Sequence, residues 1–176
     1  MKKRKILGID YGDFSIGLAV FDLETDFIYP LKTIFRTKAN ILRKSIREIV
    51  EIVNIESITD IVIGLPLNAD GTEGDRVDKV KNFAHMLKNG ITNSIDIGET
   101  HREPDVDENE NVGASIASPH CMCEPIPIYF QDERLTTVEA KTILAERGVK
   151  KTEWKKTIDQ IAAEIILQDY KQAKRM

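Results

Sequence analysis

Residues 5–21, KILGIDYGDFSIGLAVF, decide the fold of this chain. Two apolar runs, 6–9 and 16–21, lie on either side of a short polar turn that contains Gly12. This arrangement is typical of two antiparallel strands joined by a tight turn. Asp10 ends the first run. Aspartate is a poor strand residue, and burial of its charge is costly unless a metal ion or a cluster of hydrogen-bond donors offsets it. Asp10 is therefore the first candidate for a functional residue.

The apolar pattern outside this stretch predicts the order βββαβαβαα. A continuous apolar run at 59–65 is typical of a buried central strand. The predicted strands cover 5–10, 15–22, 27–36, 59–65 and 126–130, and the predicted helices cover approximately 39–54, 77–90, 137–148 and 152–172. The predicted fold class is α/β, with a mixed sheet of three antiparallel strands followed by parallel strands and flanked by helices.

The composition is that of an ordinary soluble protein. The chain has 176 residues, of which 41% are apolar and 31% charged, and this length suits one domain over 1–176. No stretch reaches the roughly 20 apolar residues of a membrane span, and Asp10 interrupts the N-terminal apolar run too early for a signal peptide. The two cysteines, Cys121 and Cys123, imply no disulfide framework. We expect a cytoplasmic protein with no membrane partner.

Residues 92–125 differ in composition from the rest of the chain. They lack periodicity and hold eight acidic residues and one basic residue. We expect an acidic inserted loop at about 92–125. The rest of the chain holds 24 basic and 21 acidic residues, so it carries a net charge of +3 although the whole chain carries -4. A mildly basic body permits the binding of nucleic acid.

Two further acidic positions lie in apolar settings similar to that of Asp10. Asp132 and Glu133 follow the predicted strand, and Asp159 lies near the start of the final helix. Adjacent strand residues point to opposite faces, so one of the pair would reach a metal ion, and we favour Glu133 for its longer side chain. Asp159 shares a helix face with alanines that would let the helix approach the sheet. The candidate catalytic residues are Asp10, Asp132, Glu133 and Asp159, and the candidate metal ligands are Asp10, Glu133 and Asp159.

Three carboxylates from separate elements form the donor set that a metal-dependent phosphodiesterase needs. Mg²⁺ or Mn²⁺ suits a coordination shell made of oxygen atoms. Two ions about 4 Å apart could share Asp10, one lowering the pKa of the attacking water and the other stabilising the leaving oxygen.

The loop at 64–74, GLPLNADGTEG, is a candidate for contact with a substrate phosphate. Its glycines allow close approach of the backbone, its polar side chains offer further donors, and arginines nearby could clamp a phosphate. Thr72 is also placed to cap the helix that follows. A purely structural strand-to-helix turn is an equally weighted interpretation. The candidate substrate-binding residues are Gly64, Asn68, Gly71, Thr72, Arg76 and Arg134.

Four blocks of the sequence resemble the signature blocks of the YqgF family and occur in the family's order. The blocks are DYGDFSIGLAV, IVIGLPLNADGTEGDRVDKV, DERLTTVEA and IDQIAAEIILQDY. The resemblance covers the chain except about 92–125, and it implies a ribonuclease-H-like fold similar to that of Holliday-junction resolvases. It also implies a nuclease, a hydrolase of phosphodiester bonds, that acts in the 5′-end processing of precursor 16S ribosomal RNA during ribosome biogenesis.

The first block departs from the family's pattern at one place. Phe14 and Ser15 stand where the family usually has a basic pair, so positive charge is missing beside the predicted metal site. Two other functions stay open, namely Holliday-junction resolution and the binding of structured nucleic acid without cleavage. The expected partner is structured nucleic acid, either precursor ribosomal RNA or branched DNA, and the chain would act as a monomer or a homodimer.

Overall fold

The computed structural model describes residues 4–36, 42–68, 70–97, 126–133, 136–146, 148 and 151–176. The elements follow the predicted order along the chain. Their bounds are β1 Lys5–Tyr11, β2 Ser15–Asp22, β3 Phe27–Phe35, α1 Leu42–Ile55, β4 Asp60–Leu65, α2 Asp75–Ile97, β5 Ile128–Asp132, α3 Thr136–Glu146 and α4 Lys151–Lys174. None of the helices in these ranges is both long enough and apolar enough to cross a membrane.

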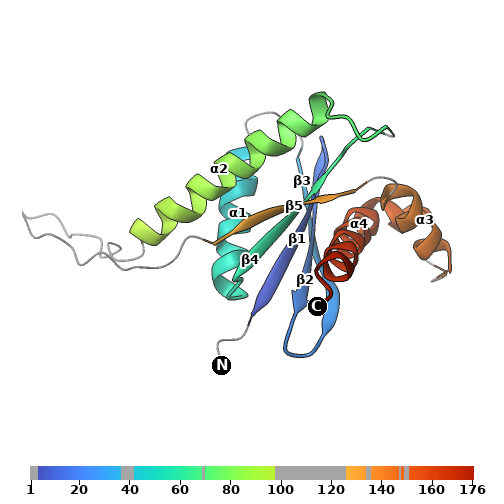
Figure 1. The fold of residues 1–176 in the computed structure, drawn as a ribbon, viewed down its shortest axis with the longest axis horizontal. Coiled ribbons are helices and arrows are strands. Elements are labelled where there is room, and N and C mark those ends of the chain that lie inside the picture. Colours follow the sequence, from blue (N-terminus) through green and yellow to red (C-terminus); the bar gives the residue numbers. More distant parts are fainter. Residues whose placement is uncertain are drawn as a thin grey trace, which may run out of the picture.

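The strands form one mixed sheet in the order β3-β2-β1-β4-β5 (Figure 1). β1 is antiparallel to β2 and β2 to β3, whereas β4 is parallel to both β1 and β5. The register pairs Asp10 with Gly17 across β1 and β2, and Ile9 with Ile63 across β1 and β4. The predicted α/β class, with a mixed sheet of three antiparallel strands followed by parallel strands and flanked by helices, is therefore confirmed.

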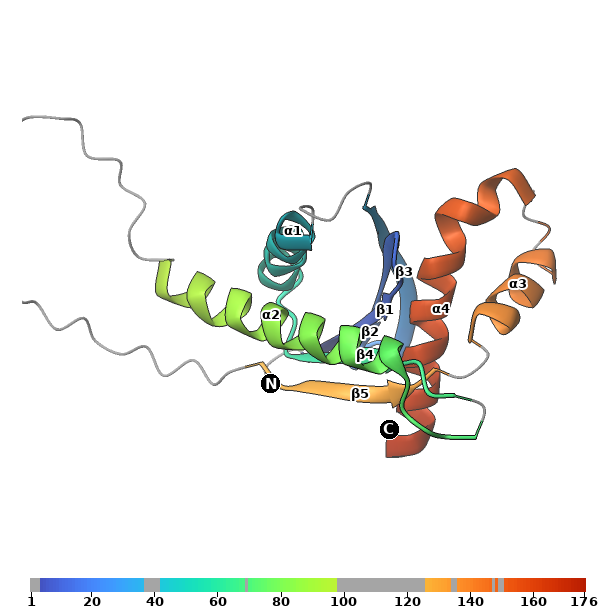
Figure 2. The same ribbon diagram turned by 90° about the horizontal axis from the view of Figure 1, so that it is seen from above.

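Helices cover both faces of the sheet, with α1 and α2 on one face and α4 on the other (Figure 2). Side chains alternate along a strand, so Leu7 and Ile9 of β1 pack on the α1–α2 side while Ile6 packs on the α4 side. The same alternation puts Asp10 on the α4 side. The first strand therefore presents its aspartate to the helix that carries Asp159.

Helix α2 is longer than the sequence predicted. It continues through Gly90 to Ile97, although glycine usually weakens a helix. Gly90 lies against α1, where a Cβ would be 2.9 Å from Cγ2 of Ile46, and Ile91 is buried. Close packing on α1 outweighs the low helix propensity. The prediction of an irregular loop is thus wrong for 92–97, and its remainder, 98–125, lies outside the described residues.

β5 is an edge strand whose bounds are set by its pairing with β4. It runs from Ile128 to Asp132, two residues later than the predicted strand, so Glu133 follows it directly. Tyr129 and Phe130 are exposed on this edge. Lys174 at the end of α4 places its Nζ 5.8 Å from the ring centroid of Tyr129.

Candidate active site

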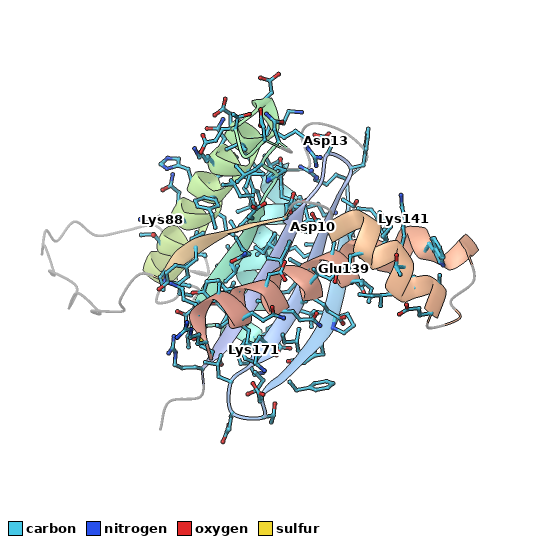
Figure 3. The ribbon with its side chains drawn as sticks, turned by 45° about the vertical axis from the view of Figure 1, so that its right-hand side comes forward. Asp10, Asp13, Lys88, Glu139, Lys141 and Lys171 are labelled. Atoms are coloured by element: carbon cyan, nitrogen blue, oxygen red, sulfur yellow. The ribbon has the colours of Figure 1, made fainter. Side chains whose placement is uncertain are left out.

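Asp10 lies near the end of β1, at the centre of the sheet (Figure 3). Its side chain is half-buried, on the face covered by α4. The pKa of the Asp10 carboxyl is raised to about 7, mainly by burial and then by the negative charge of Asp159, while Arg76 acts to lower it. The carboxyl therefore holds its proton more tightly than an ordinary aspartate, and a cation bound nearby would favour its charged form.

Glu133 enters the same region from the neighbouring parallel strands. Its backbone N–H donates to the carbonyl of Leu65 at 3.2 Å, and its side chain is buried. The carboxylate lies over Gly64 so closely that a Cβ at Gly64 would overlap Oε2 of Glu133. Burial raises the pKa of Glu133 to about 8, and the charge of Asp10 adds to this rise while Arg76 opposes it. Gly64 thus makes room for a second buried acid beside Asp10.

Asp159 approaches from the opposite layer, in the first half of α4. Its backbone carbonyl lies directly over Gly17, where a Cβ would overlap it, and Gly17 is the β2 partner of Asp10. Burial raises the pKa of the Asp159 carboxyl, and a hydrogen bond with the Ser15 side chain acts in the opposite direction. The missing side chain at Gly17 lets α4 bring its carboxylate to the end of β1.

Asp132 occupies a different environment from its neighbour. It is the last residue of β5 and is half-buried. Burial raises the pKa of Asp169 on α4, and the charges of Glu139 and Asp132 add to that rise. For Glu133, by contrast, the charge of Asp10 is the largest cause of the raised pKa after burial. Of the two adjacent acids, the structure thus brings Glu133 beside Asp10.

Basic side chains reach this region from the start of α2. Arg76 lies in the first turn and is exposed, and its charge lowers the pKa values of both Asp10 and Glu133. Lys79, one turn further along, forms an ion pair with Asp13 at 3.1 Å. Arg134, the other predicted phosphate-binding arginine, lies outside the described residues, so the structure places only Arg76.

The loop before α2 is held by its own hydrogen bonds. The Asn68 side-chain amide donates to the Thr72 hydroxyl at 2.9 Å, and that hydroxyl donates to the Asp70 carboxylate at 2.6 Å. Gly71 has a φ of 83°, which favours glycine, and no atom lies within 4 Å of a Cβ built there. Thr72 does not cap α2, because its hydroxyl bonds within the loop and the helix begins at Asp75. The loop presents Gly71 to solvent.

Comparison with known proteins assigns the chain to a family. A sequence model of the RuvX family, described as Holliday junction resolvase, matches residues 4–101 and 103–173. The chain belongs to the RuvX family. A relative from Chloroflexus aggregans, named "Putative pre-16S rRNA nuclease", is 33% identical over 175 residues, which cover 99% of this chain and 98% of the relative. A relative of the same name from Thermoanaerobacter pseudethanolicus is 32% identical over 167 residues, covering 94% of each chain.

Membership of the RuvX family assigns the chain to the nucleases, a class of hydrolase, and makes nucleic acid its partner. A solved structure of Thermus thermophilus RuvC aligns with 97% of this chain and 96% of that chain, at 10% identity and a TM-score of 0.48. A likeness at that level adds nothing to the assignment.

Sequence reasoning missed two residues of this RuvX-family site. Ser15 was recognised only as a departure from the family's basic pair, yet its side chain hydrogen-bonds Asp159. Gly17 is part of an apolar run in the sequence, yet its lack of a side chain lets the backbone of α4 lie against β2. A glycine inside a strand of apolar residues is a known mark of close backbone approach, so the sequence did carry a signal for Gly17. It carried none for the partner of Ser15.

The donor set of the site suits a divalent metal. Asp10 and Glu133 both have raised pKa values because they are buried near other acids, and a cation would relieve that repulsion. Carboxylate oxygens are the ligands that Mg²⁺ and Mn²⁺ prefer. Within the described ranges, no three acidic, histidine or cysteine side chains are close enough to share one ion. The residues fit the group in chemistry, and Asp10, Glu133 and Asp159 are those that would hold it.

Proposed function

We propose that this RuvX-family chain is a metal-dependent nuclease whose ligands are Asp10, Glu133 and Asp159. The observation that carries the proposal is that the charge of Asp10 interacts with those of two acids from other elements, Glu133 and Asp159. One comes from the central strand, one from the residue after β5, and one from α4, and burial raises the pKa of each. A fold gains no stability from burying like charges together, so we assign these residues to a bound cation.

Bound Mg²⁺ or Mn²⁺, as one ion or two, would supply Lewis acidity to the phosphate and a water of lowered pKa. Asp10 and Glu133 release their protons when they take up this role, and they hold negative charge at the centre of the site. The Ser15 hydroxyl orients the Asp159 carboxylate through their hydrogen bond. Asp132 supports Glu133 from the adjoining position and does not itself hold the ion.

Arg76 and the backbone at Gly71 are the proposed contacts to the substrate. Arg76 is exposed, and its charge lowers the pKa of Asp10. It can therefore donate hydrogen bonds to a phosphate oxygen held between itself and Asp10. Gly71 is exposed and has no side chain, so a phosphate can approach the loop closely there, although the Gly71 N–H itself donates to the Asn68 carbonyl at 2.8 Å. Asn68 and Thr72 hold the loop that presents it. Gly64 serves the site by admitting Glu133, and Arg134 is a proposed second clamp.

The proposed substrate is the 5′ end of precursor 16S ribosomal RNA, because relatives of nearly full coverage carry that name. Four-way DNA junctions are the second candidate, because the matching family is described as Holliday junction resolvase. Both substrates present phosphates at a bend or branch in a duplex. A junction cut symmetrically on two strands would require a homodimer, whereas one cut in a precursor RNA needs only one active site, which a monomer supplies.

The test is cleavage of labelled precursor ribosomal RNA and of a labelled four-way DNA junction, each with Mn²⁺ and with EDTA. We expect wild type to cut the RNA only when Mn²⁺ is present and Asp10→Asn to cut neither substrate. Cutting of the junction alone would select the second candidate. Cleavage that persists in EDTA would refute metal dependence, and binding of both substrates without cleavage would refute the nuclease assignment.

A further inference from the structure

Phe14 occupies the tip of the hairpin that joins β1 to β2. The turn is tight, because the Gly12 N–H donates to the Ser15 carbonyl at 2.9 Å and leaves only Asp13 and Phe14 between them. The Phe14 side chain is 80% exposed, more than any other phenylalanine in the described part of the chain. An aromatic ring held in water has no packing role in the fold.

Arg36, just after β3, fixes this hairpin. Its backbone N–H donates to the Phe14 carbonyl at 2.7 Å, and its guanidinium donates to the Gly12 carbonyl and to the Tyr11 hydroxyl. The guanidinium also lies 4.6 Å from the centroid of the Tyr11 ring. Tyr11 in turn stacks on Phe83 of α2, with 4.4 Å between ring centroids. The backbone that carries Phe14 is thus tied to the core on both sides of the turn.

The hairpin tip adjoins the candidate active site. Ser15, the neighbour of Phe14, hydrogen-bonds Asp159, and adjacent Cα atoms are only about 3.8 Å apart. Asp13, the neighbour on the other side (labelled in Figure 3), pairs with Lys79 of α2, one helical turn from Arg76. The two neighbours of Phe14 in the chain therefore contact a candidate metal ligand on one side and a lysine of α2 on the other.

We propose that Phe14 stacks on an unpaired base of the substrate beside the bond that is cut. This inference rests on the proposed function, and it adds a specificity-determining residue to it. An exposed ring on a fixed backbone offers one flat apolar face at little entropic cost, which matches the face of a single unstacked base. Paired bases in a duplex keep their faces covered, so Phe14 would favour a substrate with a bulge, an end or a loop at the site.

The test measures binding in the Asp10→Asn background, where the nucleic acid stays intact. The probes are an RNA duplex with one bulged 2-aminopurine and a matched duplex in which the same base is paired. Adding Phe14→Ala should weaken binding of the bulged RNA about 5- to 150-fold, the effect of losing one stacked base, and abolish the change in 2-aminopurine fluorescence. Binding of the paired duplex should be unchanged.

Three further variants control for apolar bulk and for the loss of any exposed ring. Phe14→Trp should retain the tight binding and the fluorescence change, whereas Phe14→Leu should behave like Phe14→Ala. Phe27 is also exposed, but it pairs with Asp22 at the opposite end of β2 and β3, away from Phe14. Phe27→Ala should therefore bind both probes as the parent does. Unchanged binding of bulged RNA by Phe14→Ala would overturn the inference alone. If the parent bound neither these probes nor precursor RNA or junction DNA, the proposed function would fall with it.

Discussion

Two aspartates on the central parallel strands are partnered in opposite ways. Asp60, at the start of β4, is only 6% exposed, and its carboxylate accepts hydrogen bonds from Arg4 at 3.1 and 3.2 Å and from the Thr59 hydroxyl at 2.7 Å. Asp10, near the end of β1, lies instead beside other acids, and its pKa is raised to about 7. One end of the sheet neutralises its buried carboxylate with protein groups. The other end brings acids together with only Arg76 to oppose their raised pKa values, so a bound cation would favour their charged forms.

The largest predicted effect separates these two residues by activity. Asp10→Asn should lower Mn²⁺-dependent cleavage by about 10³-fold or more, because it removes a ligand from the reacting centre. Asp60→Asn should leave cleavage within a few-fold of wild type but lower the free energy of unfolding by about 1–3 kcal/mol, since it weakens the bonds with Arg4. Single-turnover cleavage and urea unfolding measure the two quantities. Equal losses of activity in both variants would contradict the contrast.

The next effect separates Glu133 from Asp132. Glu133→Gln should lower cleavage by about 10²-fold or more, whereas Asp132→Asn should cost less than about tenfold, because it acts on Glu133 from outside the site. Calorimetric titration with Mn²⁺ provides the second measurement, and it should show weaker binding for Glu133→Gln. The assignment would have to be reversed if Asp132→Asn gave the larger loss in both assays.

A third variant changes the distance between α4 and the sheet. Gly17→Ala forces a methyl group against the Asp159 carbonyl, and we expect the free energy of unfolding to fall by about 1–3 kcal/mol as α4 moves away. Mn²⁺ affinity should fall as well, because Asp159 moves with its helix. Gly148→Ala is the matched control: its φ of 69° also disfavours alanine, but no atom lies near a Cβ there. It should lose stability without losing Mn²⁺ affinity.

The smallest predicted effect is a pH dependence of the metal-free protein. Asp10 and Glu133 have pKa values of about 7 and 8 in the folded state, above their ordinary 3.8 and 4.5. The folded protein therefore binds more protons than the unfolded chain, and the stability these groups contribute below pH 4 is lost as the pH rises through 7 and 8. Thermal unfolding in EDTA should give a Tm that falls from pH 5 to pH 8, by about 2–4 °C for each kcal/mol lost.

The control for this pH dependence is Asp10→Asn, whose Tm should fall less steeply over the same range. Adding Mn²⁺ at pH 8 should raise the Tm of wild type and leave that of Asp10→Asn nearly unchanged, since binding to the folded state alone stabilises it. Parallel Tm curves for wild type and Asp10→Asn in EDTA would show that Asp10 titrates as it does in the unfolded chain.

The sequence predicted what depends on local pattern. Apolar runs and tight turns located every strand and helix, and an aspartate closing an apolar run located Asp10. The end of α2 was not predictable, because Gly90 is tolerated through its packing on α1, a contact between segments distant in sequence. The sequence favoured Glu133 over Asp132 for its side-chain length alone, whereas its position directly after β5 and its interaction with Asp10 are visible only in the structure. Asp60 gave no sequence signal, since its partner Arg4 lies 56 residues away.

The exposed edge at β5 bears on the solubility of the protein. An edge strand with unpaired backbone groups and exposed aromatic rings is a template on which another chain can add a strand and begin aggregation. Here the ammonium group of Lys174 lies 5.8 Å from the ring centroids of Tyr129 and Tyr170. A strand added over Tyr129 would have to desolvate this charged group. The charge of Lys174 at the end of α4 therefore disfavours the addition of another strand at the β5 edge of the sheet.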